Sequence, residues 1–324
     1  MAEPAVEETA KTGVLPFATS LDDPRLEADL LPRAMSKRAL IACGAGCSVL
    51  SLARRYPDVA YTGFEPSART LAHVRAKIAA AEARDTKLLN LENESPTGLN
   101  QCGLYEDVFA HFRERLHATV APREEVLRFF RRERDLQELD ALLRTWLRNP
   151  GWKAACEGAF GDPLRAVLGS ETERNLTTTW PEYVRGALER ALRRDAAPEN
   201  PFLSLALLGM YGEDREPYYV RNGGPFELDL VEGALGDVPE IERFDLVSLG
   251  TSLDLESDAA VQAVVKLLGK LRPGAVVFVR QIGSSRSIRP FFDERFWFDD
   301  RMSRRFAERD RSVLTDRFEV AVKR

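Results

Sequence analysis

Two glycines and a carboxylate are the residues of this chain whose spacing suits cofactor binding. The apolar run at 38–43 ends in Gly44 and Gly46, and Ser48 opens the apolar segment that follows. A second apolar run ends in Glu65, about 20 residues after the first glycine, where nucleotide-binding folds place an acid for ribose hydroxyls. We therefore expect a strand, a glycine turn, a helix and a second strand that together bind an adenosine-bearing cofactor.

The residue three positions after the second glycine distinguishes between cofactors. A dinucleotide fingerprint has Gly or Ala at this position, whereas this chain has Val49. S-adenosylmethionine has no pyrophosphate and needs backbone room for its amino-acid tail and its adenosine. We expect S-adenosylmethionine, with Gly44, Gly46, Ser48 and Glu65 as binding residues. The alternatives are a turn that binds nothing and, for Glu65, a surface acid at the end of a strand.

The composition is that of a globular protein with an acidic balance. The chain has 324 residues, of which 44% are hydrophobic and 30% charged, and a net charge of -5. Nucleic-acid binding usually shows as a basic domain or stripe, so we expect no nucleic-acid partner. No apolar run is long enough for a membrane span, and the first residues lack the pattern of a signal peptide. We expect a cytoplasmic protein without a transmembrane segment, in an oligomeric state that the composition leaves open.

Histidine and cysteine are too sparse to predict a metal centre. The three histidines are His73, His111 and His117, all in segments with helical patterning. Cys43 and Cys47 lack the spacing of zinc pairs, and four cysteines are too few for a disulfide framework in a chain of this length. We expect no metal and interpret Cys43 and Cys47 as small residues in the wall of the turn.

The apolar patterning divides the chain into four segments. Residues 1–36 form an N-terminal lead, and residues 37–90 alternate strand and helix as the first half of a Rossmann-like domain. Residues 91–225 are rich in helix formers at helical spacing and predict a mainly helical insertion. Strand-like runs return in 226–324, the second half of the domain. The predicted fold class is α/β, a doubly wound Rossmann-like sheet with a large helical insertion.

The end of the insertion resembles a segment of a known enzyme family. Asn200-Pro-Phe-Leu begins an apolar stretch that ends in Gly209-Met-Tyr-Gly, and Pro217-Tyr-Tyr-Val-Arg-Asn follows. The likeness also includes Ala45-Gly-Cys, Arg272-Pro-Gly and Arg317-Phe-Glu-Val. The chain thus resembles the S-adenosylmethionine:diacylglycerol 3-amino-3-carboxypropyltransferases of betaine-lipid synthesis, over most of its length from about Lys37 onward. The resemblance implies a class I methyltransferase-like fold.

The resemblance also implies an enzyme that does not transfer the methyl group of S-adenosylmethionine. Members of the family direct a nucleophile at the γ-carbon of the methionyl chain, which releases methylthioadenosine and transfers the 3-amino-3-carboxypropyl group. The sulfonium is already activated, so an in-line approach of the nucleophile supplies much of the remaining acceleration. The family pattern favours Asn200 as a cofactor-binding residue, although an asparagine before a proline equally predicts a helix start.

Two departures from the family pattern bear on the nucleophile. Gly233-Ala-Leu replaces Gly-Asp-Leu, so backbone groups near Ala234 and Leu235 would have to hold the adenine. Thr251 replaces an acid after the fourth strand, where a lipid hydroxyl would benefit from a base. An amine needs less help, because its lone pair is available once the amine is neutral. We therefore prefer an amine as the nucleophile.

Three neutral polar side chains are our candidates for catalytic residues that orient this amine, namely Tyr211, Ser248 and Asn175. Tyr211 lies between two glycines and either faces the sulfonium or belongs to the apolar core. Ser248 ends a strand, where open sheets form crevices. Asn175 either orients the amine or caps the next helix.

The preferred reaction is cyclisation or transfer to a small amine. Attack by the cofactor's own α-amino group closes a four-membered ring and gives azetidine-2-carboxylate without any acceptor. The alternatives are transfer of the 3-amino-3-carboxypropyl group to diacylglycerol, a small-molecule methyltransferase that depends on S-adenosylmethionine, and a non-catalytic relic that only binds.

Overall fold

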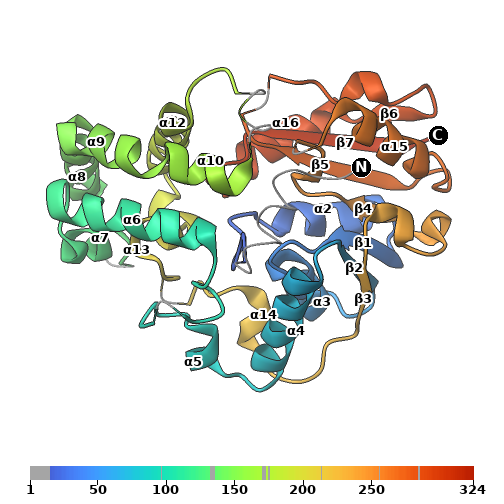
Figure 1. Ribbon diagram of the computed structural model, residues 1–324, viewed down its shortest axis with the longest axis horizontal. Coiled ribbons are helices and arrows are strands. Elements are labelled where there is room, and N and C mark those ends of the chain that lie inside the picture. The colour runs from blue at the N-terminus through green and yellow to red at the C-terminus, as the bar shows by residue number, and fades with distance from the viewer. Residues whose placement is uncertain are drawn as a thin grey trace.

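The computed structural model describes residues 15–95, 97–131, 136–169, 173, 176–212, 214–254, 256–283 and 285–324. Within these residues a seven-stranded sheet lies on one side of the molecule, and a group of helices lies on the other (Figure 1). The chain is therefore a mixed α/β protein, which confirms the predicted fold class at this level.

Apolar runs rich in β-branched and aromatic residues form the strands. They are β1 (Arg38–Ala42), β2 (Ala60–Glu65), β3 (Leu228–Glu232), β4 (Leu246–Ser248), β5 (Val276–Gln281), β6 (Phe296–Phe298) and β7 (Arg317–Lys323). Their spatial order is β3-β2-β1-β4-β5-β7-β6. Strands β1 to β5 are parallel, and β7 runs antiparallel to both β5 and β6. The order reverses between β1 and β4, and open α/β sheets bind ligands at the carboxyl ends of such a strand pair.

Both faces of the sheet are covered at its interior strand β1, where the consecutive residues Ala39, Leu40 and Ile41 are buried although neighbouring residues of a strand point to opposite faces. On β1, Ala39 and Ile41 belong to one core cluster and Leu40 belongs to another. The first cluster includes residues of α2 (Arg25–Arg33), α3 (Cys47–Arg55), α4 (Ala68–Glu82) and α16 (Asp300–Arg309). The second includes residues of α15 (Asp258–Leu268). The near-continuous apolar strands suit a sheet that is covered on both sides.

The segment between α4 and β3 is mainly helical. Its helices are α5 (Thr86–Leu89), α6 (Leu104–Thr119), α7 (Arg123–Phe129), α8 (Leu136–Arg148), α9 (Pro150–Ala159), α10 (Asp162–Leu168), α12 (Trp180–Leu192), α13 (Pro201–Leu208) and α14 (Tyr218–Arg221). Trp146, Trp152 and Trp180 are almost fully buried among them, in the same core cluster as α2 and α3. Across the described ranges, no helix combines the length and the apolar character needed to cross a membrane.

The described part of the predicted N-terminal lead is an integral part of the fold. Helix α2 packs against β4 and β5. Residues 15–23, called the strap below, begin where Leu15 forms a bridge with Gly103, just before α6. The strap ends where the carbonyl of Asp23 accepts a 2.7 Å hydrogen bond from Arg280 of β5. It therefore connects the insertion to the carboxyl edge of the sheet.

Candidate functional site

The turn between β1 and α3 has the backbone conformation that its glycines predict. Gly44 and Gly46 have φ angles of +46° and +83°, in the left-handed region that favours glycine. A Cβ on Gly44 would meet no atom within 4 Å, whereas a Cβ on Gly46 would lie 3.0 Å from the side chain of Val74. Gly44 therefore borders open space, while Gly46 packs against α4. Ser48 is half-buried in the first turn of α3.

Glu65 lies at the end of β2, the strand adjacent to β1. The two strands are in register up to Phe64, so Glu65 emerges beside the glycine turn. Its Oε1 accepts a 3.0 Å hydrogen bond from the amide of Ser67, which caps α4, and the Glu65 side chain is half-buried. The Glu65 carbonyl accepts a 3.0 Å bond from the amide of Gly233. The glycine turn, this carboxylate and the loop after β3 thus lie along one edge of the sheet.

The loop after β3 contains Ala234 and Leu235, near which the sequence predicts backbone groups for adenine. The amide of Ala234 donates to Oδ2 of Asp237 at 2.8 Å, and Leu235 is buried in the core. Asp237 also lies directly against Gly233, where an added Cβ would meet it at 2.7 Å. Asp237 therefore places a carboxylate in this loop. This residue was not predicted from the sequence. Its position four residues after Gly233 was the only feature of the sequence that could have indicated it.

A buried lysine connects the strap to the glycine turn. Lys77 of α4 is fully buried, and its Nζ donates to the carbonyls of Ala18 and Ala45 and lies 3.3 Å from Sγ of Cys47. His73 lies one helical turn earlier, and its Nε2 is 3.0 Å from the carbonyl of Ala18. Helix α4 therefore fixes the strap and the turn relative to each other.

Glu106 of α6 holds the strap from the insertion. Its two carboxylate oxygens accept hydrogen bonds from the amides of Ala18 and Thr19, each at 2.9 Å. Burial raises the pKa of Glu106 to about 7, although the two amide hydrogen bonds oppose this rise. Burial, helped by the charge of Lys77, lowers the pKa of His73 to about 4. At neutral pH His73 is therefore uncharged, while Glu106 is near its titration midpoint.

Tyr211, a predicted catalytic side chain, approaches the turn through Thr19. Its hydroxyl is 3.4 Å from Oγ1 of Thr19, which in turn is 3.4 Å from Sγ of Cys47. Cys47 directly follows Gly46 and is the first residue of α3. Burial raises the pKa of the Tyr211 phenol. The hydroxyl is therefore a neutral hydrogen-bonding group at this position.

Ser248 lies at the end of β4, as predicted, but within a closed hydrogen-bond network. Its Oγ donates to Oε1 of Glu27 at 2.9 Å, and Arg280 binds both oxygens of the same carboxylate. Ser248 and Arg280 are each only 1% exposed. The three side chains join β4 and β5 to α2, so the Ser248 hydroxyl faces that helix.

The two predicted asparagines have different outcomes. Asn200 caps α13, since its Oδ1 accepts hydrogen bonds from the amides of Phe202 and Leu203. Its Nδ2 donates to the carbonyl of Arg311 at 2.9 Å. These bonds use the Asn200 side chain as a helix cap. Asn175 lies outside the described residues.

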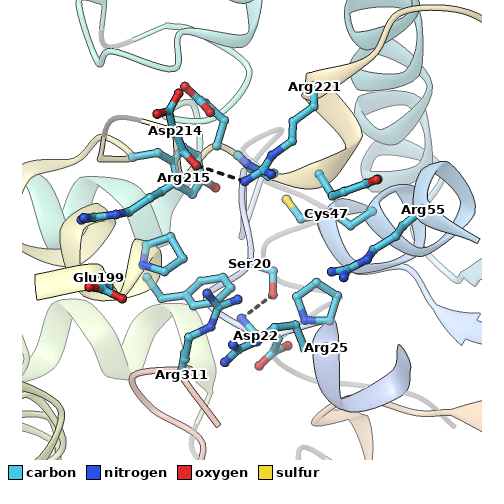
Figure 2. A pocket seen from close by; sticks show the side chains of 18 residues that line it. Ser20, Asp22, Arg25, Cys47, Arg55, Glu199, Asp214, Arg215, Arg221 and Arg311 are labelled. Atoms are coloured by element: carbon cyan, nitrogen blue, oxygen red, sulfur yellow. Dashed lines mark hydrogen bonds between the residues drawn. The ribbon is translucent and has the colours of Figure 1, made fainter. Parts of the chain in front are cut away.

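A cleft of about 640 Å³ opens between α3, the strap and the end of the insertion (Figure 2). The arginines that line it are Arg25, Arg55, Arg215, Arg221 and Arg311, and the acids are Asp22, Glu199, Asp214 and Glu216. Cys47 and Tyr211 also line it and are buried, so they form its inner end. This volume is in the range of small-molecule sites, and the cleft reaches the same turn that borders the sheet edge.

Sequence reasoning missed Lys77, Glu106 and the strap as parts of the site. His73 and Lys77 are four positions apart, so a helix would place them on the same face. If this face is buried, their polar groups need hydrogen-bond partners. This spacing was the feature of the sequence that could have indicated a role for Lys77. The main partner of Lys77 is the carbonyl of Ala18, which is 59 residues away in the chain, and no residue pattern identifies a backbone group at that distance.

Within the described part of the chain, no group of three or more His, Cys, Asp or Glu side chains is arranged to hold a metal ion. The site consists of the glycine turn, the Glu65 carboxylate at the end of β2, the strap and the cleft. Comparison with known proteins adds no assignment, because no family model, no curated protein and no solved structure matches the chain.

Proposed function

We propose that this chain is a class I methyltransferase-like enzyme that uses S-adenosylmethionine as a substrate. It directs a nucleophile at the γ-carbon of the methionyl chain and releases methylthioadenosine. The observation that carries the proposal is the open space in front of Gly44, at the reversal of strand order, with Glu65 at the end of the adjacent strand. Open α/β sheets bind nucleotide cofactors at this position.

The strand order supports the fold in this proposal. Parallel strands in the order 3-2-1-4-5 are those of a Rossmann sheet. An antiparallel strand inserted between the fifth and sixth positions, like β7, is typical of class I methyltransferase-like domains. In this arrangement Glu65 binds the ribose hydroxyls, and the loop of Ala234 and Leu235, with Asp237, lies against the adenine. The glycine turn leaves room for the methionyl chain.

The groups beside the turn favour an amine as the nucleophile. The hydroxyls of Tyr211 and Thr19 adjoin the first residue of α3. Neutral hydroxyls orient an amine without favouring its ammonium form, so its lone pair stays available. This lone pair forms the new N–C bond as the C–S bond breaks. The C–S electron pair leaves with the neutral thioether, and the amine loses a proton to solvent.

Mass spectrometry of the purified protein incubated with S-adenosylmethionine tests the proposal. We expect methylthioadenosine in excess of a control without enzyme, since the cofactor also decays slowly by itself. Azetidine-2-carboxylate in equal amount would identify the cofactor's own amine as the nucleophile. S-adenosylhomocysteine instead would show methyl transfer and refute attack at the γ-carbon. If calorimetry detected no binding of S-adenosylmethionine, every proposal in which the chain is an enzyme that uses this substrate would be refuted.

A further inference from the structure

The cleft beside α3 has two ends of different chemistry. Cys47, Ser51 and Arg55 line it at positions i, i+4 and i+8 of the helix. These positions share one helix face and span about 12 Å. Cys47 is buried beside Gly46, whereas Arg55 is exposed. The cleft therefore follows α3 from the glycine turn to the surface.

Two arginines without acidic partners lie at the outer end. The guanidinium carbons of Arg55 and Arg221 lie 5.2 Å and 5.6 Å from the centre of the same Tyr218 ring. Arg221 also donates to the carbonyl of Asp214 at 3.2 Å (Figure 2). Among the residues that the structure describes, neither guanidinium has a carboxylate within ion-pair distance. Both guanidiniums line the same cleft, and planar guanidiniums bind carboxylate and phosphate through paired donors.

The other arginines of the cleft already have protein partners. Arg25 and Arg311 both pair with Asp23, which is fully buried, at 2.7 Å and 2.9 Å. Arg215 donates to the carbonyls of Phe130 and Pro198. These three side chains therefore hold the strap and the insertion in place, and they leave Arg55 and Arg221 as the cations for a ligand.

Acids line the cleft as well, so its lining does not suit a purely anionic ligand. Glu199, Asp214 and Glu216 lie in the same lining as Arg55 and Arg221. A ligand that carries both an amine and an oxyanion complements such a mixed surface better than a polyanion does. At the inner end, Tyr211 lines the cleft with a neutral hydroxyl, and the hydroxyl of Thr19 lies 3.4 Å from it.

We infer that the cleft binds an elongated amine with a carboxylate or phosphate at its far end, and that this amine is the acceptor of the 3-amino-3-carboxypropyl group. Arg55 and Arg221 hold the oxyanion, and the amine reaches Tyr211 beside the glycine turn. The inference rests on the proposed function and deepens it, because it selects transfer to an acceptor over cyclisation. The acceptor nitrogen bonds to the γ-carbon, the C–S electron pair leaves with methylthioadenosine, and the acceptor releases one proton to solvent.

Binding of probes without S-adenosylmethionine tests the site independently of the reaction. The carboxylate probes are ε-aminocaproate and ω-aminododecanoate, with hexylamine and dodecylamine as controls that lack the oxyanion. The phosphate probes are ω-aminohexyl phosphate and ω-aminododecyl phosphate, with the same two amines as their controls. By calorimetry we expect at least one carboxylate or phosphate probe to bind about tenfold more tightly than its control, which is about 1.4 kcal/mol. Tighter binding of the carboxylate probes than of their controls would identify a carboxylate ligand, and tighter binding of the phosphate probes would identify a phosphate ligand.

Variants of the two arginines show whether this preference comes from the cleft. Arg55→Gln with Arg221→Gln should abolish the preference for the oxyanion. Arg304→Gln removes an exposed arginine of α16 that does not line the cleft, and should leave the preference unchanged. Equal binding of probes and controls, or a preference that survives the double variant, would overturn the inference.

Turnover with S-adenosylmethionine tests the acceptor role. The probe that binds should accelerate the release of methylthioadenosine and gain a 3-amino-3-carboxypropyl group, and the double variant should raise its KM about tenfold without changing the KM of S-adenosylmethionine. A raised KM for S-adenosylmethionine instead would place the methionyl carboxylate at these arginines and refute the acceptor site. Azetidine-2-carboxylate as the sole product, at a rate that no probe changes, would refute the acceptor but not the proposed function. Absence of methylthioadenosine under all conditions would refute the proposed function. The binding measurements on the wild type and on the double variant would then decide by themselves whether the cleft binds an amine with an oxyanion.

Discussion

Gly44 and Gly46 share a left-handed backbone but differ in their surroundings. Alanine at either position costs about 1 kcal/mol or more in backbone strain. At Gly46 the added Cβ would also press on Val74, whereas at Gly44 it would enter open space. A substitution at Gly46 therefore tests mainly the stability of the turn, whereas a substitution at Gly44 tests mainly the space that the turn leaves for a ligand.

We predict different losses for alanine at these two glycines. Gly46→Ala should lower the free energy of unfolding by about 2–3 kcal/mol, because strain and the contact with Val74 add. Gly44→Ala should cost only about 1 kcal/mol but weaken the binding of S-adenosylmethionine at least about tenfold. Urea unfolding and calorimetry measure the two effects. Undiminished binding in Gly44→Ala would show that the methionyl chain lies elsewhere.

Glu65 and Glu232 provide a matched pair of strand-end acids. They are register partners on the adjacent strands β2 and β3, so they lie at the same level of the sheet. If Glu65 binds the ribose hydroxyls, Glu65→Ala should raise the Kd of S-adenosylmethionine about 10-fold to 100-fold, because hydrogen bonds to a charged acceptor are lost. Glu232→Ala should change the Kd by less than about threefold. The reverse result would move the ribose to β3.

At the scale of elements, one buried ion pair attaches the N-terminal helix to the sheet. Glu27 of α2 binds Arg280 of β5 and accepts a hydrogen bond from Ser248 of β4. Arg280 also lies over the ring of Phe278, 4.7 Å from its centre. A buried pair of this kind is costly to break from one side, because the remaining charge has no partner.

We predict a strongly non-additive result for this pair. Arg280→Met should lower the free energy of unfolding by about 3–5 kcal/mol, since the Glu27 carboxylate is then buried without a counter-ion. Combining it with Glu27→Met should recover at least about half of the loss, because two apolar side chains of similar volume replace two charges. Urea unfolding of both single variants and the double variant measures the coupling energy. Additive losses would mean that the two side chains act independently.

Elements were more predictable from the sequence than the contacts between them. The apolar runs at 38–43 and 61–65 predicted two strands, and the helical spacing of 91–225 predicted helices; the structure has β1, β2 and the helices α6 to α14 there. Strand β6 was missed, because three residues are too short to show a period. The role of α2 was also missed, because its partner Arg280 is 253 residues away and its polar residues look like those of any amphipathic helix.

At the scale of the whole molecule, the strap connects parts that lie far apart in the sequence. It contacts α4 through Lys77, α6 through Glu106 and β5 through Arg280. Figure 1 shows the insertion and the sheet on opposite sides of this connection. The sheet edge, the glycine turn and the cleft therefore depend on one short segment whose partners include a titrating carboxylate.

The pH dependence of stability should report on this carboxylate. Burial raises the pKa of Glu106 from 4.5 to about 7 in the folded protein, so between these values the folded state binds the proton more tightly than the unfolded chain does. Its contribution to stability is therefore greatest at acid pH and is lost as the pH rises from about 4.5 to about 7, a change of about 3 kcal/mol. His73 has the opposite sign, since its lowered pKa adds stability as the pH rises from about 4 to 6.5.

Glu106→Gln isolates the contribution of Glu106, because glutamine has nearly the same shape as the protonated acid and does not titrate. The contributions of His73, and of Asp254 and Asp310, whose pKa values burial raises to about 6, are present in both proteins and cancel in the difference. At the acid end the variant should be the less stable protein, because its Nε2 cannot accept the second strap amide that Glu106 binds. Urea unfolding between about pH 5 and pH 8 should then show a relative shift of about 2–3 kcal/mol in favour of the variant as the pH rises. A difference that stays constant with pH would mean that the carboxylate keeps an ordinary pKa, and that its two bonds to the strap fully offset its burial.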